Sequence, residues 1–203
     1  MVILLSENEE KKESEEKEEE IYTFIEGENI DLTPTNSEHV EIYAKWSNSE
    51  KIRKYARNEV PRTIEEMKKR HEKPKEGPRE HIGMEIWHKK DKKLIGIGGL
   101  NHINWYARTA NIFMQIGEMD YWSQGIGTEA AKLIVDYGFM ELNLHKIYAG
   151  VLSKNVGSWT CAEKVGFIQE ATLKEEAYVD GQYLDVKKFY ILKDNWLEGK
   201  KLT

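Results

Sequence analysis

The chain has 203 residues, of which 39% are hydrophobic and 33% are charged. This length supports one domain with a full core and leaves too little for two ordinary domains. The formal net charge is −6, and the nine Glu and three Lys between Glu7 and Glu20 account for all of it. The rest of the chain is close to neutral and has no cluster of Lys and Arg, so we expect no nucleic-acid partner.

The N-terminal segment has almost no apolar residue to bury. We therefore expect residues 1–20 to form a disordered acidic leader and residues 21–203 to form a single domain. The apolar run from Met1 to Leu5 is too short for a signal peptide or a membrane span. Because Cys161 is the single cysteine, an internal disulfide is excluded. These features predict a cytoplasmic protein with no membrane partner.

The first half of this domain begins with a predicted strand pair, or one bent strand, over Ile21–Leu32. Apolar residues at helical spacing, beginning after a cap at Ser37, then predict short helices over residues 37–46, 52–55 and 64–70. A loop with Pro74, Gly77 and Pro78 ends this helical stretch. Alternating apolar residues predict three antiparallel strands over residues 81–88, 94–100 and 110–117.

The second half begins with a glycine loop over Ser123–Gly127, followed by a helix that ends near Leu142. A strand over residues 145–152 and a helix over residues 158–165, ended by Gly166, come next. The last predicted unit is a hairpin that turns at Asp180–Gly181. The order β-β-β-α-β-α-β-β predicts an α/β protein of the α+β type.

The glycine loop has the features of an anion site. It reads Tyr-Trp-Ser-Gln-Gly-Ile-Gly-Thr from Tyr121 to Thr128, and its glycines leave backbone N–H groups uncovered at the positive end of a helix. A diphosphate would fit there. The loop lacks the lysine of a Walker motif and the third glycine of a dinucleotide fingerprint, so an ATP-binding role ranks last. A glycine pair that only permits close packing of helix on strand remains an alternative.

A second motif makes a family resemblance specific. The segment from Asn155 to Phe167 reads Asn-x-x-Ser-x-x-x-x-Glu-Lys-x-Gly-Phe immediately after a predicted strand. Together with the glycine loop, it resembles the coenzyme A core of GCN5-related N-acetyltransferases (GNAT), and the likeness extends from about Glu28 to Trp196. Within that superfamily, the chain looks most similar to ribosomal-protein N-terminal acetyltransferases and their relatives that act on small amines. The resemblance implies a mixed, mostly antiparallel sheet of about seven strands, splayed in the middle, with helices on both faces.

The resemblance also implies acetyl-CoA as cofactor and assigns residues to it. Pantetheine would insert between the splayed strands, Asn155 would hydrogen-bond this arm, and Ser158 would lie at the thioester sulfur. Asn155 and Ser158 could alternatively serve only as helix caps. The remaining assigned residues are those of the strand end and of the loop, where the backbone N–H groups and the Thr128 hydroxyl would hold the diphosphate: Gln115, Ile116, Gly117, Gln124, Gly125, Ile126, Gly127 and Thr128.

Amine acetylation needs a neutral nucleophile, so some group must take a proton from the ammonium. Glu118 ranks first as this base, ahead of Glu175 and Glu176. In the ribosomal-protein enzymes, a glutamate just before the tyrosine of the last hairpin is implicated in catalysis. Here that position is Ala177, which weakens the transfer of that substrate class to this chain. Backbone at Gln115–Gly117 would stabilise the developing oxyanion, and the Ser158 hydroxyl would assist departure of the thiolate.

Two further site types are not expected. The six histidines show no paired ligand spacing, so no metal is predicted. Cys161 has no evident histidine partner and is interpreted as a buried, inert thiol. The sequence therefore predicts an N-acetyltransferase that acts by direct attack, with a protein N-terminal amine as the main acceptor. Alternatives are a small amine or polyamine acceptor and a non-catalytic acyl-CoA-binding module, and a homodimer stays open.

Overall fold

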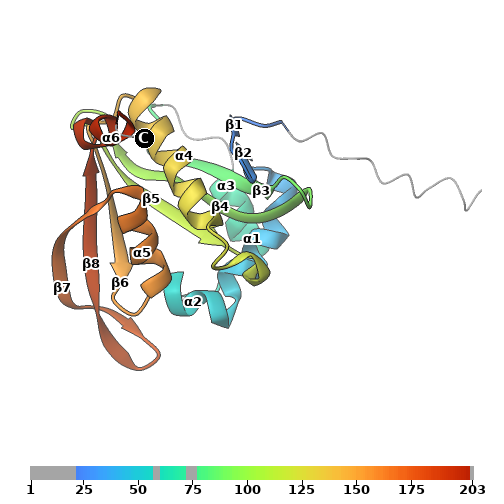
Figure 1. Ribbon diagram of the computed structural model, residues 1–203. Coiled ribbons are helices and arrows are strands. Elements are labelled where there is room, and N and C mark those ends of the chain that lie inside the picture. Colours follow the sequence, from blue (N-terminus) through green and yellow to red (C-terminus); the bar gives the residue numbers. More distant parts are fainter. Residues whose placement is uncertain (1–21, 57–59, 72–76, 202–203) are drawn as a thin grey trace, which may run out of the picture.

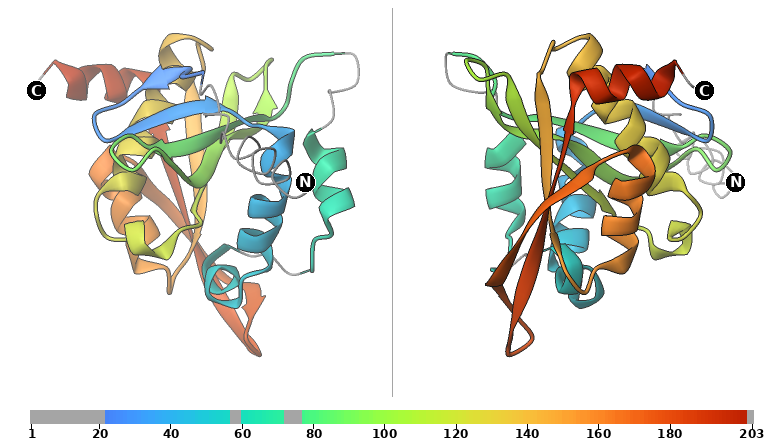
Figure 2. Two further views of the ribbon diagram at one scale, coloured as in Figure 1. Left: turned by 90° about the vertical axis from the view of Figure 1, so that its right-hand side faces the viewer. Right: turned by 60° about the vertical axis from the view of Figure 1, so that its left-hand side comes forward.

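The computed structural model describes residues 22–56, 60–71 and 77–201. The expected leader over residues 1–20 lies outside these ranges. The described chain forms an eight-stranded sheet in the order β1-β2-β3-β4-β5-β6-β8-β7, with helices on both faces (Figures 1 and 2). No helix in the described ranges is long and apolar enough to cross a membrane.

The elements follow the predicted order, with one additional helix at the C-terminal end. The strands are β1 (Ile25–Glu26), β2 (Ile30–Pro34), β3 (Ile82–His88), β4 (Lys93–Asn104), β5 (Thr109–Ile116), β6 (Lys146–Leu152), β7 (Ile168–Val179) and β8 (Gln182–Leu192). The helices are η1 (Ser37–His39), α1 (Val40–Asn48), α2 (Glu50–Ala56), α3 (Ile64–His71), η2 (Met119–Tyr121), α4 (Ile126–Met140), α5 (Val156–Val165) and α6 (Lys193–Lys200).

The sheet is mixed and mostly antiparallel, as the family resemblance implied. Every neighbouring pair of strands is antiparallel except β5 and β6, which are parallel. There are eight strands instead of about seven, because the first segment is a true strand pair in which Ile25 is the partner of Leu32. The last hairpin turns at Asp180–Gly181 as predicted, where both residues have positive φ.

Two of the three apolar clusters among the described residues hold the helices on the sheet. The larger one lies where α4 and α5 cover the sheet, and it includes Ile134, Phe139 and Phe189. The smaller one lies under α1 and includes Tyr43 and Trp46. Figure 2 shows these helices on opposite faces of the sheet. The sheet therefore has an α4 face and an α1 face, and these names are kept below.

Helix α6 was not predicted from the sequence. Its residue Trp196 packs at the edge of the larger core, and the Trp196 Nε1 group donates to Asp136 Oδ1 of α4 at 3.0 Å. Lys200 of the same helix also bonds Asp136. The helix is thus held by contacts with α4 that its own sparse apolar pattern does not reveal.

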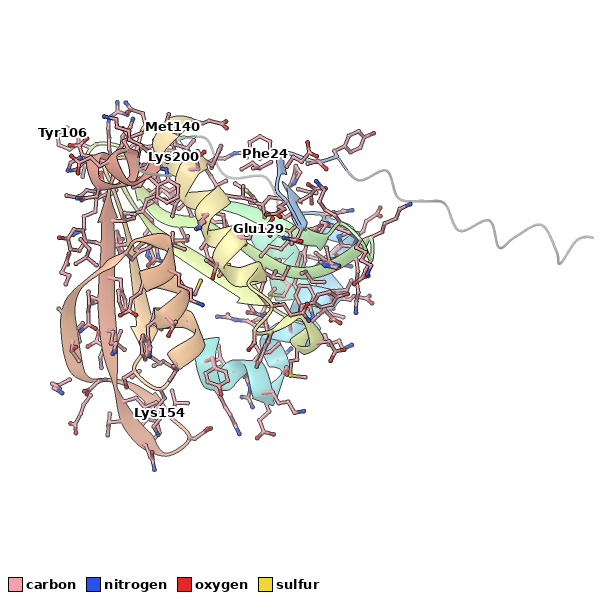
Figure 3. The ribbon with its side chains drawn as sticks, viewed as in Figure 1. Phe24, Tyr106, Glu129, Met140, Lys154 and Lys200 are labelled. Carbon is pink, nitrogen blue, oxygen red and sulfur yellow. The ribbon has the colours of Figure 1, made fainter. Side chains whose placement is uncertain are left out.

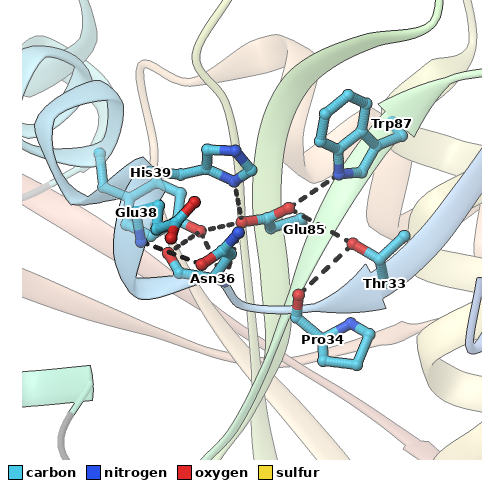
Figure 4. Close-up of polar contacts among 8 residues, drawn as sticks. Thr33, Pro34, Asn36, Glu38, His39, Glu85 and Trp87 are labelled. Atoms are coloured by element: carbon cyan, nitrogen blue, oxygen red, sulfur yellow. Dashed lines mark hydrogen bonds and ion pairs between the residues drawn. The ribbon is translucent and has the colours of Figure 1, made fainter. Parts of the chain in front are cut away.

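A buried carboxylate attaches α1 to the sheet. Glu85 of β3 is 1% exposed, and its oxygens accept hydrogen bonds from Asn36 N–H (3.0 Å) and Trp87 Nε1 (2.8 Å). His39 Nδ1 lies 2.7 Å from Glu85 Oε1, and the Tyr43 hydroxyl donates to the same oxygen. Figure 4 shows this cluster, which we call the Glu85 network. Such a charge is tolerated in a core because hydrogen-bond donors surround it.

Candidate active site

Strands β5 and β6 part from each other along most of their length. They pair only at Thr109–Lys146, Ala110–Ile147 and Asn111–Tyr148. Beyond this vertex, and within the described residues, β5 continues to Ile116 paired only with β4, and β6 continues paired only with β8. Apart from the Ile116 carbonyl, which accepts the Trp122 indole, most of the two facing main-chain edges can pair with an extended ligand, because backbone N–H and C=O groups require partners. We call this feature the β5–β6 opening.

The N-terminus of α4 lies at the far end of β5 from the vertex. Its cap residue is Gly125, with φ +84°, and the N–H groups of Thr128 and Glu129 return to the Gly125 carbonyl at 2.9 and 3.0 Å. Within the described residues, the N–H groups of Ile126 and Gly127 donate to no other backbone group. A Cβ atom placed on Gly125 would meet nothing within 4 Å. These open amides at a positive helix end suit an anion.

Side chains of the loop bind the protein rather than extending toward a ligand. The Trp122 Nε1 group donates to the Ile116 carbonyl at 2.9 Å, and the Gln124 amide donates to the Asp120 carbonyl at 2.6 Å. The ring of Trp122 also makes an edge contact with Tyr55 of α2, with centroids 6.2 Å apart. The loop is therefore held rigidly while its backbone stays available.

Two of the residues predicted to bind the diphosphate or the arm differ from expectation. The Thr128 hydroxyl bonds Cys161 Sγ of α5 at 3.6 Å, and its N–H is taken by Gly125. The Gly117 N–H donates to the Ile95 carbonyl at 2.9 Å. These groups are already used in hydrogen bonds within the protein. Gly125, Ile126 and Gly127 therefore remain as candidates for binding the diphosphate through their backbone. Burial raises the pKa of the Cys161 thiol, which favours the inert form.

The carboxylate of Glu129 would compete with an anion at this helix end, but it is directed elsewhere. Its Oε1 atom accepts the N–H groups of Glu28 (2.7 Å) and Asn29 (2.9 Å), and its Oε2 atom accepts the Asn29 amide (3.0 Å). Figure 3 places Glu129 on the side of α4 next to the turn between β1 and β2. The N-terminus of α4 thus keeps its positive character.

Both oxygens of Glu118 are engaged at the end of β5. Oε2 pairs with Lys93 Nζ at 2.7 Å, and Oε1 accepts the Trp46 Nε1 group at 2.9 Å. The hydrogen bond from Lys93, followed by the one from Trp46, lowers the pKa of Glu118. Gly117 permits this arrangement, because a Cβ there would lie 2.0 Å from the Trp46 ring. A carboxylate that holds its proton so weakly is poorly suited to act as the general base.

Asn155 and Ser158 lie at the start of α5, beside the opening. The Asn155 side chain accepts the Ser158 N–H at 3.1 Å, so Asn155 is the helix cap, and the helix begins at Val156 instead of Ser158. The Ser158 side chain is exposed. The structure therefore gives Asn155 the capping role and leaves the Ser158 hydroxyl available for chemistry.

The two remaining candidate bases lie elsewhere. Glu175 and Glu176 fall in the β-bulge of β7 between Leu173 and Ala177, and the Glu175 N–H is held by Asp185 Oδ1 at 3.0 Å. Strand β8 separates β7 from the opening. Among the described residues, no three His, Cys, Asp or Glu side chains gather as a metal site requires.

Side chains of β5 alternate between the two faces of the sheet. Met114 faces α4, since a Cβ on Gly127 would lie 3.3 Å from its methyl carbon. Phe113 and Gln115 therefore face α1, and the Gln115 Nε2 atom is buried without a partner in the described chain. The ring of His81 stacks on Phe113 with centroids 5.1 Å apart and an interplanar angle of 20°. Sequence reasoning missed His81, because it tested the histidines only as metal ligands.

This combination of opening and helix end coincides with a family match. The family model described as "Acetyltransferase (GNAT) domain" matches residues 29–168, which is more than half of the chain. The chain belongs to the GNAT acetyltransferase family. The crystal structure of spermidine N-acetyltransferase from Vibrio cholerae, in complex with CoA and spermine, superimposes with a TM-score of 0.74 and 27% identity, covering 83% of this chain and 98% of that one.

Curated relatives are similar over part of the chain. A spermidine N(1)-acetyltransferase from Vibrio cholerae serotype O1 is 38% identical over 106 residues, which are 52% of this chain and 61% of the relative. A putative ribosomal N-acetyltransferase, YdaF from Bacillus subtilis, is 30% identical over 111 residues, or 55% of this chain and 60% of the relative. The matched region thus spans about three fifths of these relatives.

Proposed function

We propose that this chain is an acetyl-CoA-dependent N-acetyltransferase that acts on a primary amine. The observation that supports it most directly is the placement of open amides at the start of α4 beside the unpaired edges of β5 and β6. The start of α4 suits the diphosphate of coenzyme A, and the strand edges suit its extended pantetheine arm. The family match agrees with this assignment.

The residues present fit the cofactor. The N–H groups of Ile126 and Gly127, with the open space at Gly125, would hold the diphosphate. The edge of β5 up to Ile116 would pair with the pantetheine arm. When bound, acetyl-CoA supplies an activated acetyl group as a thioester. The Ser158 hydroxyl would donate a proton to the departing sulfur, because it is exposed at the start of α5.

The favoured acceptor is a small polyamine. A relative named spermidine N(1)-acetyltransferase is 38% identical, and a neighbour at 27% identity was crystallised with spermine. A protein N-terminal amine is the second candidate, supported by the 30% identity to a putative ribosomal N-acetyltransferase. The first acceptor replaces the second as the main prediction, because the relatives with the higher identities carry the polyamine name.

Calorimetry and a coenzyme A release assay test the proposal. We expect CoA to bind, and we expect acetyl-CoA to be consumed with spermidine or spermine but slowly with N-terminal peptides. Faster turnover of peptides would favour the second acceptor. Tight binding of CoA without release on any amine would instead support a non-catalytic acyl-CoA-binding module. Failure to bind CoA would contradict the proposal altogether.

A further inference from the structure

The length of the arm determines where the acetyl group would lie. An arm paired along β5 from the start of α4 runs back toward the vertex at Asn111. At about 3.3 Å per residue, the five residues from Ile116 to Ile112 cover about 16 Å. A pantetheine arm of about that length would place its reactive end beside Phe113, well away from Glu118 at the loop end of the strand. Because α4 and α5 cover one face of the sheet, the acceptor amine would approach from the α1 face.

The His81 side chain lies on that face, held by packing against its neighbours. Its ring lies nearly parallel to the ring of Phe113. Gly83 pairs with Gly99, and Gly99 pairs with Phe113, so two successive partners in this row have no side chain. A Cβ on Gly83 would lie 3.2 Å from His81 Nε2, which shows that the imidazole covers the bare backbone. The glycines thus make room for this ring beside the β5–β6 opening.

We propose that His81 is the general base that takes the proton from the acceptor amine; this inference rests on the proposed function. Imidazole is the side chain that most often serves as a general base in proton transfer. Glu118 and Glu85 are both engaged by hydrogen-bond donors. Arg79 and Glu80 precede His81 in the chain, and its ring packs against the ring of Phe113 and the backbone of Gly83.

The step balances without any additional reactant. The acceptor ammonium transfers one proton to an imidazole nitrogen of His81, and the neutral amine forms a C–N bond to the thioester carbonyl carbon. The C–S bond breaks, and the second proton of the amine nitrogen passes to the sulfur, with Ser158 as donor. The products are the acetamide and free coenzyme A, and His81 returns its proton to water.

The first test is His81→Gln, with His145→Gln as matched control. His145 is an exposed residue ahead of β6, and its backbone bonds Arg108 and Lys193. We expect kcat of H81Q with spermidine to fall about 10²- to 10³-fold, as for loss of a general base. The wild-type kcat/KM should fall on the acidic side of its pH profile, where the imidazole of His81 gains a proton, and H81Q should lack this limb. An unchanged acidic limb in H81Q would overturn the inference, whatever happens to kcat.

A gentler variant separates chemistry from packing. Gly83→Ala keeps the imidazole but places a methyl group 3.2 Å from Nε2 and so displaces the ring slightly. We expect kcat to fall several-fold while the acidic limb is retained. A wild-type kcat in G83A, combined with a retained limb in H81Q, would indicate a bystander ring.

A second readout does not depend on turnover. The ring proton NMR signals of His81, assigned by their loss in H81Q, should shift when CoA is added, and those of His145 should not. If calorimetry shows that CoA binds and the His81 signals stay unchanged, the base assignment is overturned and the proposed function stands. If CoA does not bind at all, the proposed function itself fails and the base assignment falls with it.

Discussion

The Glu85 network and the β5–β6 opening are two polar regions of one sheet, and they are built in opposite ways. In the network, a fully buried carboxylate is surrounded by donors from η1, α1 and β3, so no charge is left uncompensated. In the opening, the facing edges of β5 and β6 beyond the vertex and the first two amides of α4 have no backbone partner among the described residues. Buried or edge polar groups that a fold leaves unsatisfied indicate where a ligand completes it. The comparison therefore separates a region that stabilises the fold from one that serves binding.

The largest expected effect is on the stabilising region. Replacing Glu85 with Ala removes the carboxylate that accepts from the Tyr43 hydroxyl, the Trp87 indole and the Asn36 N–H, and leaves a cavity in its place. We expect the free energy of unfolding in urea to fall by about 3–5 kcal/mol. Glu41→Ala, on the exposed side of α1, should change it by less than about 0.5 kcal/mol. Equal stability of the two variants would show that the network does not hold α1.

The next effect belongs to the opening. Gly125 has φ +84° and open space around its Cα; any side chain is strained at this φ, but Asn and Asp adopt positive φ more often than other residues and should carry a similar strain. Gly125→Asp places a carboxylate where the diphosphate would bind, whereas Gly125→Asn does not. We expect CoA to bind G125D about 10- to 100-fold more weakly than G125N by calorimetry, with similar melting temperatures. Equal affinities would place the anion away from α4.

A smaller effect tests the start of α5. Ser158→Ala keeps the backbone N–H that Asn155 caps and removes only the hydroxyl. Because a thiolate leaves readily even without assistance, we expect kcat to fall only about tenfold, with the melting temperature unchanged. Asn155→Ala should instead lower stability by about 1 kcal/mol through loss of the cap. Normal turnover in S158A would make Ser158 a bystander.

The smallest effect concerns Glu118. Its pKa is lowered in the folded protein, so its pairing with Lys93 stabilises the fold above the ordinary carboxylate pKa and is lost as the pH falls through the lowered value. We expect Glu118→Gln to lose less stability than the wild type between about pH 5 and 3, by a small margin, because Lys93 is half-exposed. A steeper acid loss in E118Q would contradict this sign.

Patterns of local sequence predicted the start of α4 and its suitability for an anion, but not the Glu85 network. The glycine loop correctly marked the start of α4, and the Asp180–Gly181 turn marked the last hairpin, because such glycine signals are short-range. The splayed strands were implied only by the family resemblance. Helix α6 escaped prediction because contacts with Asp136 hold it.

Contacts between distant residues account for what was missed. Three partners of Glu85 (Asn36, His39 and Tyr43) come from 42 to 49 positions earlier, and no spacing rule joins them to it. Glu118 reads as an open strand-end carboxylate until the fold brings Lys93 and Trp46 to it. His81 similarly acquires its place through Phe113, which is 32 positions away. Tertiary pairing, which local pattern does not encode, decides which titratable groups remain available.

The attachment of Glu129 to the turn between β1 and β2 links the beginning of the chain to the anion site. A shortened protein that starts at Ile30 would lack most of that turn, and the freed carboxylate would stand in the first turn of α4. Its charge would then repel any phosphate approaching the helix. Deleting residues remote from the proposed anion site should thus weaken binding of coenzyme A, so tags or truncations near Gly27 are not neutral choices when this protein is prepared.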